Sequence, residues 1–319
     1  MDFLTFPLLF SFLLAFAYVI IISGRRNSRL PPGPFPLPVI GNLLCLGDKP
    51  HHSLATLSKR YGPLMSLKLG SKTTVVVSSP GIAKEFFQKH DRFFSSRSIP
   101  DSVRAVNHNK YSIVFLPAED QWRKLRKICK EYIFSVQRLD AGELLRRKKA
   151  LFTAGIDTTA SKLEWAMTEL IRNPEKLETA RSEVNKLMKN KNGIVQESDI
   201  SQLPYLQAVI KETLRLHPPV TFLVPHQAVC DTDFHGYMVP KNAQVLCNLW
   251  AMGRDPKIWS CPETFFPERF LEVKIDYKGQ DFEFIPFGSG RRMCPGLNLA
   301  HRMLHIILGS LILKFDLEV

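Results

Sequence analysis

The residue of this sequence best placed for chemistry is Cys294, in the loop Phe-Gly-Ser-Gly-Arg-Arg-Met-Cys-Pro-Gly at 287–296. Pro295 follows it, and proline is favoured at the first position of a helix. We therefore expect Cys294 at a helix N-terminus, where free N–H groups, the helix dipole and two nearby arginines lower the thiol pKa. A thiolate in that position is a suitable axial ligand for haem iron.

The neighbours of Cys294 suit a flat cofactor that carries carboxylates. Gly290 and Gly296 let the backbone approach a macrocycle closely, and Arg292 has the planar donor fork that suits a haem propionate. The alternative is a buried structural cysteine beside a turn, the commoner situation for a lone cysteine. The pattern Phe-x-x-Gly-x-Arg-x-Cys-x-Gly, starting at Phe287, resembles the haem-thiolate signature of the cytochrome P-450 superfamily.

A second element of the site is the helix that we expect at 121–131. Its periodicity places Trp122 and Arg126 on one face. By resemblance to helix C of the family, these side chains would hold a propionate. The alternative is a core tryptophan with a surface arginine. The other arginines and lysines of this helix either form a solvated face or dock an acidic electron donor.

An apolar helical pattern at 151–165 contains Ala154, Gly155, Asp157 and Thr158. Glycine and short polar side chains weaken a helix, so we expect a local distortion. The alternative is that Asp157 or Thr158 caps a helix starting at residue 161. The string resembles the family's helix I, which implies a kink beside the haem, formed at Ala154 and Gly155, that opens a groove for dioxygen. Asp157 and Thr158 would then relay protons to that groove.

Three charged residues match a structural triad of the same family. Glu212 and Arg215 are i, i+3 neighbours on an expected helix, a spacing that more often forms a surface ion pair. Together with Arg269 in the motif Pro-Glu-Arg-Phe, they resemble the triad that locks the core behind the haem. His226 matches a position used for a propionate contact, and a structural histidine is the alternative.

Composition indicates a packed, basic protein. The chain has 319 residues, of which 45% are hydrophobic and 23% charged, with a formal net charge of +13. This excludes a disordered chain and suits an acidic partner or an anionic membrane face. No nucleic-acid motif is present. The absence of paired or zinc-type cysteine spacing indicates a reducing compartment; the cysteines are Cys45, Cys129, Cys230, Cys247, Cys261 and Cys294.

The N-terminal run at 3–22 contains no charge and is long enough to cross a bilayer. Arg25, Arg26 and Arg29 follow it, which places the rest of the chain in the cytosol. No positive residue precedes the run, so we expect a retained single-pass anchor in the endoplasmic reticulum membrane and not a cleaved signal. The proline-rich stretch at 30–41 resembles the hinge of microsomal members, and a plain spacer is the alternative.

The fold expected for 42–319 is mainly α with a small β-region. Patterns along the chain predict a hairpin at 65–69 and 73–77, a loop at 103–115 and a pocket-lining strand within 218–228. Further helices are expected at 80–88, 174–190, 205–217 and 295–312.

The chain departs from the family pattern in two places. Trp122 and Ala154 lie close together in sequence, whereas the family has helices D to H, including the lid over the substrate pocket, between the matching positions. We place the junction near Lys149. The chain also stops at Val319, within what resembles a late strand. The resemblance therefore implies an internally deleted and C-terminally shortened member, most similar to plant microsomal geraniol and terpenoid hydroxylases.

The function implied by this resemblance is haem-thiolate monooxygenation. A small apolar, terpenoid-like substrate would be hydroxylated with O2, using electrons from NADPH through a membrane-bound reductase. The alternative, favoured by the missing lid, is a non-catalytic membrane-anchored haem-binding fragment or a chain that does not fold. A haem isomerase that needs no reductase is a weaker alternative, because the acid–alcohol pair of helix I is retained.

Overall fold

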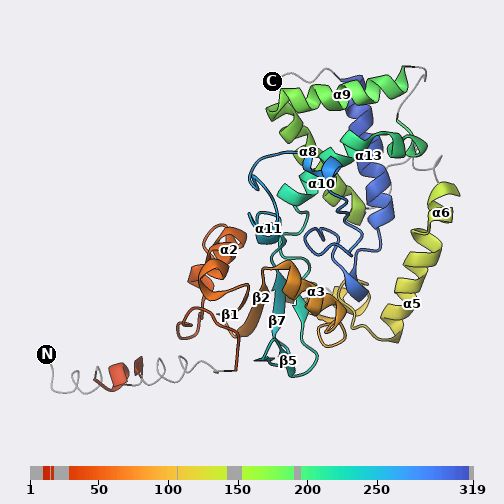
Figure 1. Cartoon of the computed structure of the whole chain (residues 1–319). Helices are drawn as coiled ribbons and strands as arrows, with labels where there is room; N and C mark the ends of the chain where they lie inside the picture. Colours follow the sequence, from red (N-terminus) through yellow and green to blue (C-terminus); the bar gives the residue numbers. More distant parts are fainter. Residues whose placement is uncertain are drawn as a thin grey trace.

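The computed structural model describes residues 10–14, 16–17, 29–105, 107–141, 153–189 and 195–315, with the side chains of 153–156 excepted. Figure 1 shows a β-rich half, with α2 and α3 beside the sheet, and a helical half, in which α8, α9, α10 and α13 lie together. Most of the expected anchor at 3–22 and the expected junction at Lys149 lie outside the described residues. Within the described part of the chain, no helix is long and apolar enough to cross a bilayer.

The β-rich half contains a five-stranded sheet in the order β1-β2-β7-β4-β3 and a separate pair, β5-β6. The hairpin of β1 and β2 is confirmed, and β2 pairs with β7 in parallel. The strand expected within 218–228 forms regular pairing only at its end, in β4. The strand bounds are β1 Leu64–Leu69, β2 Lys72–Val77, β3 Ser96–Arg97, β4 His226–Gln227, β5 Thr232–Phe234, β6 Tyr237–Val239 and β7 Gln244–Cys247.

Alternation of apolar side chains places one cluster on each face of the sheet. Val76 packs with Leu54 of α2 on one face. Val75 and Val77 pack with Phe86 of α3 on the other. Because both faces are covered, β1 and β2 have continuous buried runs and their outer ends alone are exposed.

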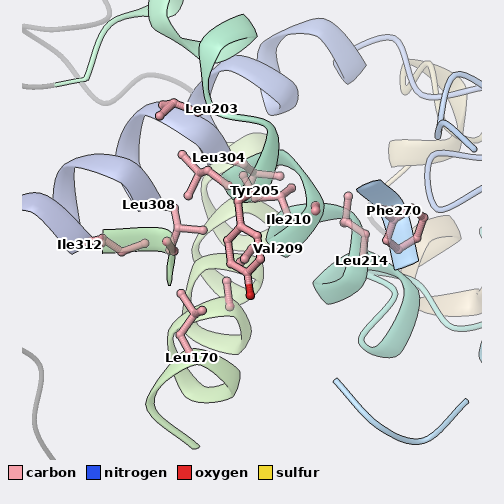
Figure 2. Packing of buried hydrophobic residues seen from close by; sticks show 14 of the residues in the cluster. Leu170, Leu203, Tyr205, Val209, Ile210, Leu214, Phe270, Leu304, Leu308 and Ile312 are labelled. Atoms are coloured by element: carbon pink, nitrogen blue, oxygen red, sulfur yellow. The ribbon is translucent and has the colours of Figure 1, made fainter. Parts of the chain in front are cut away.

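The helical half surrounds the largest apolar cluster. Figure 2 shows Leu170 of α8, Val209 of α10 and Leu308 of α13 converging in it. The helix bounds are α2 Pro50–Tyr61, α3 Pro80–Gln88, α4 Asp101–Ala105, α5 Asp120–Ile128, α6 Val136–Ala141, α8 Thr153–Arg172, α9 Pro174–Met188, α10 Pro204–Leu216, α11 Leu249–Met252, α12 Arg269–Glu272 and α13 Leu297–Lys314. Short 3-10 helices span Leu43–Cys45, His108–Lys110, Glu197–Gln202 and Gly290–Arg292, and a π-helical segment spans Cys129–Ile133.

Proline marks several helix starts correctly. Pro50, Pro80, Pro174 and Pro204 each stand in the first turn of a helix, where the missing N–H costs nothing and the fixed φ suits the helix. Ser79 also caps α3, because its hydroxyl accepts from the N–H of Ile82.

Two local expectations were wrong. The segment 103–115 is not a plain loop, because α4 reaches residue 105 and a 3-10 turn spans His108–Lys110. The helix α8 runs continuously through Asp157 and Thr158, so the alternative of a cap for a helix starting at residue 161 is wrong. The local distortion expected at this turn stays a prediction.

Candidate functional site

The loop that carries Cys294 is held by backbone bonds. The N–H of Cys294 donates to the carbonyl of Phe287 at 2.9 Å, while the Phe287 side chain packs against the helical core. Helix α13 begins at Leu297 with Gly296 as its N-cap. Cys294 therefore precedes the helix by two residues more than the proline rule predicted, and it lies outside the first helical turn.

The thiol pKa of Cys294 is raised, which corrects the expectation that it is lowered. Burial by surrounding protein atoms is the largest cause, although the residue remains exposed on one side. The N–H of Gly296 and the charge of Arg126 act in the opposite direction and favour the thiolate. The adjacent Arg291 contributes little because its guanidinium is directed to Asp91, with Nε 2.8 Å from Oδ2.

Glycine stands at positions 290 and 296 of the loop for different physical reasons. Gly290 has φ +65°, and a Cβ there would lie 3.0 Å from the carbonyl oxygen of Phe87. It is therefore required by the conformation and by contact with α3, a reason that the sequence did not reveal. A Cβ on Gly296 would meet only the Cys294 sulfur at 3.9 Å. The space over Gly296 is thus open beside the thiol, as a flat ligand requires.

Arg292 joins three segments of the chain. Its Nε donates to the carbonyl of Ser95 at 2.9 Å, and its Nη2 donates to that of Leu116 at 2.6 Å. Its guanidinium lies over the ring of Trp122, 4.7 Å from the centroid. The Trp122 indole donates to the carbonyl of Ile113 at 3.0 Å. Trp122 therefore positions the Arg292 guanidinium through a cation–π contact.

Two other arginines and a histidine lie close to Arg292. Arg126 of α5 is within electrostatic range of both Arg292 and Cys294, and burial lowers its pKa. Arg97 on β3 is buried, and burial together with Arg292 lowers its pKa to about 9. His226 lies opposite Arg97 in the β3–β4 pairing. Burial lowers its pKa well below the ordinary value, with Arg97 contributing, and its Nδ1 bonds the carbonyl of Phe94 at 2.8 Å.

This cluster of Arg97, Arg126, Arg292 and His226 fits haem. Nε of Arg97 is buried with no hydrogen-bond partner. The carboxylate acting on the cluster, Asp91, itself bonds Arg291. Buried cations are stable only when paired with an anion, and a cofactor with carboxylates would supply that pairing. The arrangement also offers a ligand for the iron, because the exposed thiol of Cys294 lies within electrostatic range of Arg126.

Asp157 and Thr158 are exposed on α8. Ala154 and Gly155 lie in the first turn of the same helix, where side chains are not described. The roles of these four residues remain predictions.

The charged triad is assembled as expected. Nη2 of Arg215 donates to Oε1 of Glu212 at 2.7 Å, and Nε of Arg269 donates to the same oxygen at 3.2 Å. All three side chains are almost fully buried. Arg215 also donates to the carbonyl of Pro262 at 2.7 Å. The triad therefore ties α10 to the segment at 253–269, and the surface ion pair proposed as an alternative is wrong.

Arg97 and Asp91 were missed by sequence reasoning. Arg97 lies in the short polar run Ser-Ser-Arg-Ser at 95–98, with no periodicity to mark it as buried. Its burial follows from pairing of β3 with β4, which comes much later in the chain. The arginine in a run of small residues was the available signal.

Comparisons with known proteins agree with this geometry. The family model described as cytochrome P-450 matches residues 31–139 and 130–319. Geraniol 8-hydroxylase of Swertia mussotii is 36% identical over 458 residues, covering 99% of this chain and 92% of the relative. Ferruginol synthase of Salvia miltiorrhiza is 35% identical over 458 residues, covering 98% and 92%. A zebra fish cytochrome P-450 structure with progesterone matches with a TM-score of 0.68 at 22% identity, covering 83% of this chain and 92% of that chain.

Proposed function

This chain belongs to the cytochrome P-450 family, and we propose that Cys294 is the axial ligand of a haem iron. The observation that carries the proposal is the cluster of Arg97, Arg126, Arg292 and His226 beside an exposed thiol. When bound, haem supplies the activation of dioxygen, which thiolate ligation favours. The reaction class is monooxygenation.

The residues of the cluster have separable roles in binding. Arg292 and Arg126 would pair with propionates, and Trp122 orients Arg292 by stacking under its guanidinium. Arg97 would gain the partner that its Nε lacks. The N–H of Gly296 donates to the Cys294 sulfur, which holds the thiolate toward the open side of the loop.

Asp157 and Thr158 would move protons to the dioxygen site. An acid and an alcohol adjacent on one helix can pass a proton between a carboxylate and a hydroxyl. Both side chains are exposed on α8 and accessible to water. Controlled proton transfer would therefore require another segment that shields them from bulk water.

A small apolar, terpenoid-like molecule is the proposed substrate. Its support is the likeness to proteins named geraniol 8-hydroxylase and ferruginol synthase. Electrons would come from NADPH through an acidic reductase that meets the basic face of α5, where Arg123 and Lys127 are exposed. The proposed location is the endoplasmic reticulum membrane, with the charge-free run at 3–22 as the anchor.

A second candidate is a membrane-anchored haem-binding protein with no turnover. It is supported by the aligned lengths, because 458 residues exceed the 319 of this chain, so the relatives contain residues that this chain lacks. The family match also comes in two pieces that meet at 130–139, just before the position where we place the internal deletion. Without helices D to H, the chain would have no lid over the substrate pocket.

The test is a reduced carbon-monoxide difference spectrum of the full chain and of six variants, each with one cysteine changed to serine. We expect the Cys294→Ser variant alone to lose the thiolate-type band. Retention of that band by Cys294→Ser would show that the ligand assignment is wrong. Turnover with reductase and NADPH then separates the two candidate functions.

A further inference from the structure

Two adjacent arginines, Arg291 and Arg292, precede Cys294 in the loop and have different surroundings. The side chain of Arg291 is 50% exposed and pairs with Asp91. The guanidinium of Arg292 lies instead over the ring of Trp122. Because the two side chains are chemically identical, their own chemistry does not decide which of them takes which place. Their partners must make that choice.

The turn that carries the two arginines separates them. Gly290–Arg292 forms a 3-10 turn, in which successive side chains point about 120° apart because there are three residues per turn. Arg291 and Arg292 therefore cannot face the same side. A rotation of the turn by one residue would exchange their places and would also displace Cys294, which follows on the same short loop. Whatever fixes this turn decides which arginine faces the cofactor together with the thiol.

Asp91 fixes the turn from outside it. The preceding residue, Ser289, provides no side-chain cap, because its hydroxyl donates to the carbonyl of Gly279 at 2.7 Å. Oδ2 of Asp91 accepts from the Nε of Arg291 at 2.8 Å and, at a longer 3.4 Å, from the N–H of the same residue. A carboxylate that receives both the backbone and the side chain of one residue fixes the direction of that residue.

The segment that follows α3 receives both arginines, but with different groups. The carboxylate of Asp91 receives Arg291, whereas the neutral carbonyl of Ser95 receives the Nε of Arg292 at 2.9 Å. The side chain of Asp91 is only 14% exposed, and a Cβ on Gly290 would lie 3.2 Å from its Oδ1. The close fit leaves Asp91 little freedom to turn toward Arg292. Its negative charge therefore neutralises Arg291 first.

The charge of Asp91 and the position of Arg291 support each other. Burial raises the pKa of Asp91, whereas the hydrogen bonds and the charge of Arg291 lower it. Arg291 thus favours the ionised carboxylate, and the ionised carboxylate holds Arg291. Loss of the negative charge would release the guanidinium of Arg291 beside the cation cluster.

We propose that Asp91 is a positioning residue of the cofactor site, which holds Arg291 away from the cofactor so that Arg292 and Cys294 face it. This inference rests on the proposed haem ligation by Cys294 and deepens it. Asp91 does not touch the cofactor in this arrangement. It acts through the turn at 290–292, and its effect should therefore appear in how haem is ligated more than in how much haem is bound.

The test compares two measurements on the full chain after reconstitution with haem. Total bound haem is measured as its pyridine complex after denaturation, which does not depend on the native ligand. The thiolate-type band is measured in the reduced carbon-monoxide difference spectrum. The ratio of the band to total haem gives the fraction with thiolate ligation. In Asp91→Asn, which keeps the size and an acceptor oxygen but removes the charge, we expect this ratio to fall several-fold while total haem stays similar.

A second substitution separates this role from a general effect on folding. The double variant Asp91→Asn, Arg291→Gln should restore the ratio, because no second guanidinium then competes with Arg292. Damage to the fold would not be repaired in this way. The matched control is Glu263→Gln in a different segment, which breaks a pair of the same kind, with Nε of Arg254 2.9 Å from Oε2 of Glu263. It should leave the ratio unchanged.

The remaining outcomes each decide against the proposal. A normal ratio in Asp91→Asn would overturn it while leaving the ligand assignment intact. A reduced ratio that the double variant does not restore would mean that Asp91 supports the fold and does not choose between the arginines. If the wild-type chain binds haem and shows no thiolate-type band, the assignment of Cys294 and the role of Asp91 are both wrong.

Discussion

At the scale of single residues, the site contains the buried Arg97 and the half-buried Arg126 and Arg292, whose partial removal from water opposes folding. Burial lowers the pKa of Arg97 to about 9 and that of Arg292 to about 10, which means that the charged forms are destabilised in the folded chain. A ligand that pairs with these charges only in the folded state shifts the equilibrium toward folding. Haem binding and stability should therefore be coupled in this chain.

Arg97 is the residue on which to test this coupling. Because its Nε has no partner in the folded chain, Arg97→Met should weaken haem binding by roughly ten- to a hundredfold, the value of a charge-assisted hydrogen bond. Titration of the purified chain with haemin, followed by Soret absorbance, measures the affinity.

The control for Arg97 is Arg291→Gln. Arg291 is half-exposed and already paired with Asp91, so its loss should leave haem affinity nearly unchanged. Equal losses of affinity in the two variants would mean that general basicity, and not the cluster, holds the cofactor.

Lys162 is a second buried cation, away from the Cys294 loop. Its Nζ donates to the carbonyl of His217 at 2.6 Å, and burial lowers its pKa to about 8. Since the folded pKa is below the unfolded one, the charged lysine destabilises the fold fully below about pH 8. That penalty is relieved as pH rises from there toward the unfolded pKa. Lys162→Met should thus stabilise the chain at pH 7 by about 1–2 kcal/mol, allowing for the lost hydrogen bond.

Urea unfolding at two pH values tests the Lys162 prediction. The gain from Lys162→Met should be present at pH 7 and should shrink clearly at pH 10. A gain that is equal at both values would show that the methionine acts through packing and not through the charge.

Spacing in the sequence identified the residues that lie near one another along the chain. Trp122 with Arg126, and Glu212 with Arg215, are helical neighbours, so the period of a helix fixes their common face. Arg97 could not be found this way, because its place is set by pairing with a strand far along the chain. The direction of the Cys294 pKa shift was also wrong, because desolvation depends on packing that the sequence does not display.

At the scale of elements, local sequence signals predicted where helices start better than they predicted the conformation within and at the ends of those helices. Proline in the first turn predicted the starts of α3 and α9, whereas the end of α5 is a π-helical segment that periodicity did not indicate. The helix α8 begins at Thr153, before Asp157 and Thr158, whereas the capping alternative placed its start at residue 161. Contacts with α10 and α13 hold its later turns, and such contacts are not visible in a local pattern.

The start of α10 depends on a carboxylate from another helix. Leu203 at its N-cap provides no side-chain cap. Instead, Glu183 of α9 accepts from the N–H of Tyr205 at 2.8 Å and from the N–H of Leu206 at 2.9 Å. Glu183→Ala should lower the free energy of unfolding by about 1–3 kcal/mol, because two helix N–H groups lose their acceptor.

Glu178→Ala on the same helix is the matched control for Glu183. Glu178 is exposed and accepts a hydrogen bond from Ser182 within α9, so its replacement should change the free energy of unfolding by less than about 0.5 kcal/mol. Chemical unfolding of both variants measures the difference. Equal effects would contradict the capping role of Glu183.

At the scale of the whole molecule, the described residues include those that we propose bind the cofactor. The buried triad joins α10 to the segment before α12, and the cation cluster joins α5, β3 and the Cys294 loop. The alignment with one relative spans 458 residues against the 319 of this chain, and the family match comes in two pieces, 31–139 and 130–319. Under our proposal of an internal deletion between these pieces, haem binding and turnover would depend on different segments.

Exposed apolar side chains follow α5, immediately before that middle region. Tyr132 is 60% exposed and Val136 is 51% exposed, with Ile133 between them at 43%. Side chains of this kind are normally covered by a neighbouring element. The helix D to H segment that we propose is missing would be a suitable cover for these side chains.

The last prediction concerns turnover. Asp157 and Thr158 are exposed on α8, so water would reach the proposed proton relay, and without a lid the substrate would not be held near the iron; we therefore expect the 319-residue chain to have little or no monooxygenase activity. Inserting the helix D to H segment of a relative at Lys149 should raise turnover with reductase and NADPH, and should lower the binding of a hydrophobic dye as Tyr132 and Val136 become covered. The Cys294→Ser form of the restored chain is the control, since it should lose turnover and keep the reduced dye binding. Equal turnover by the original and restored chains would show that this segment is dispensable for catalysis.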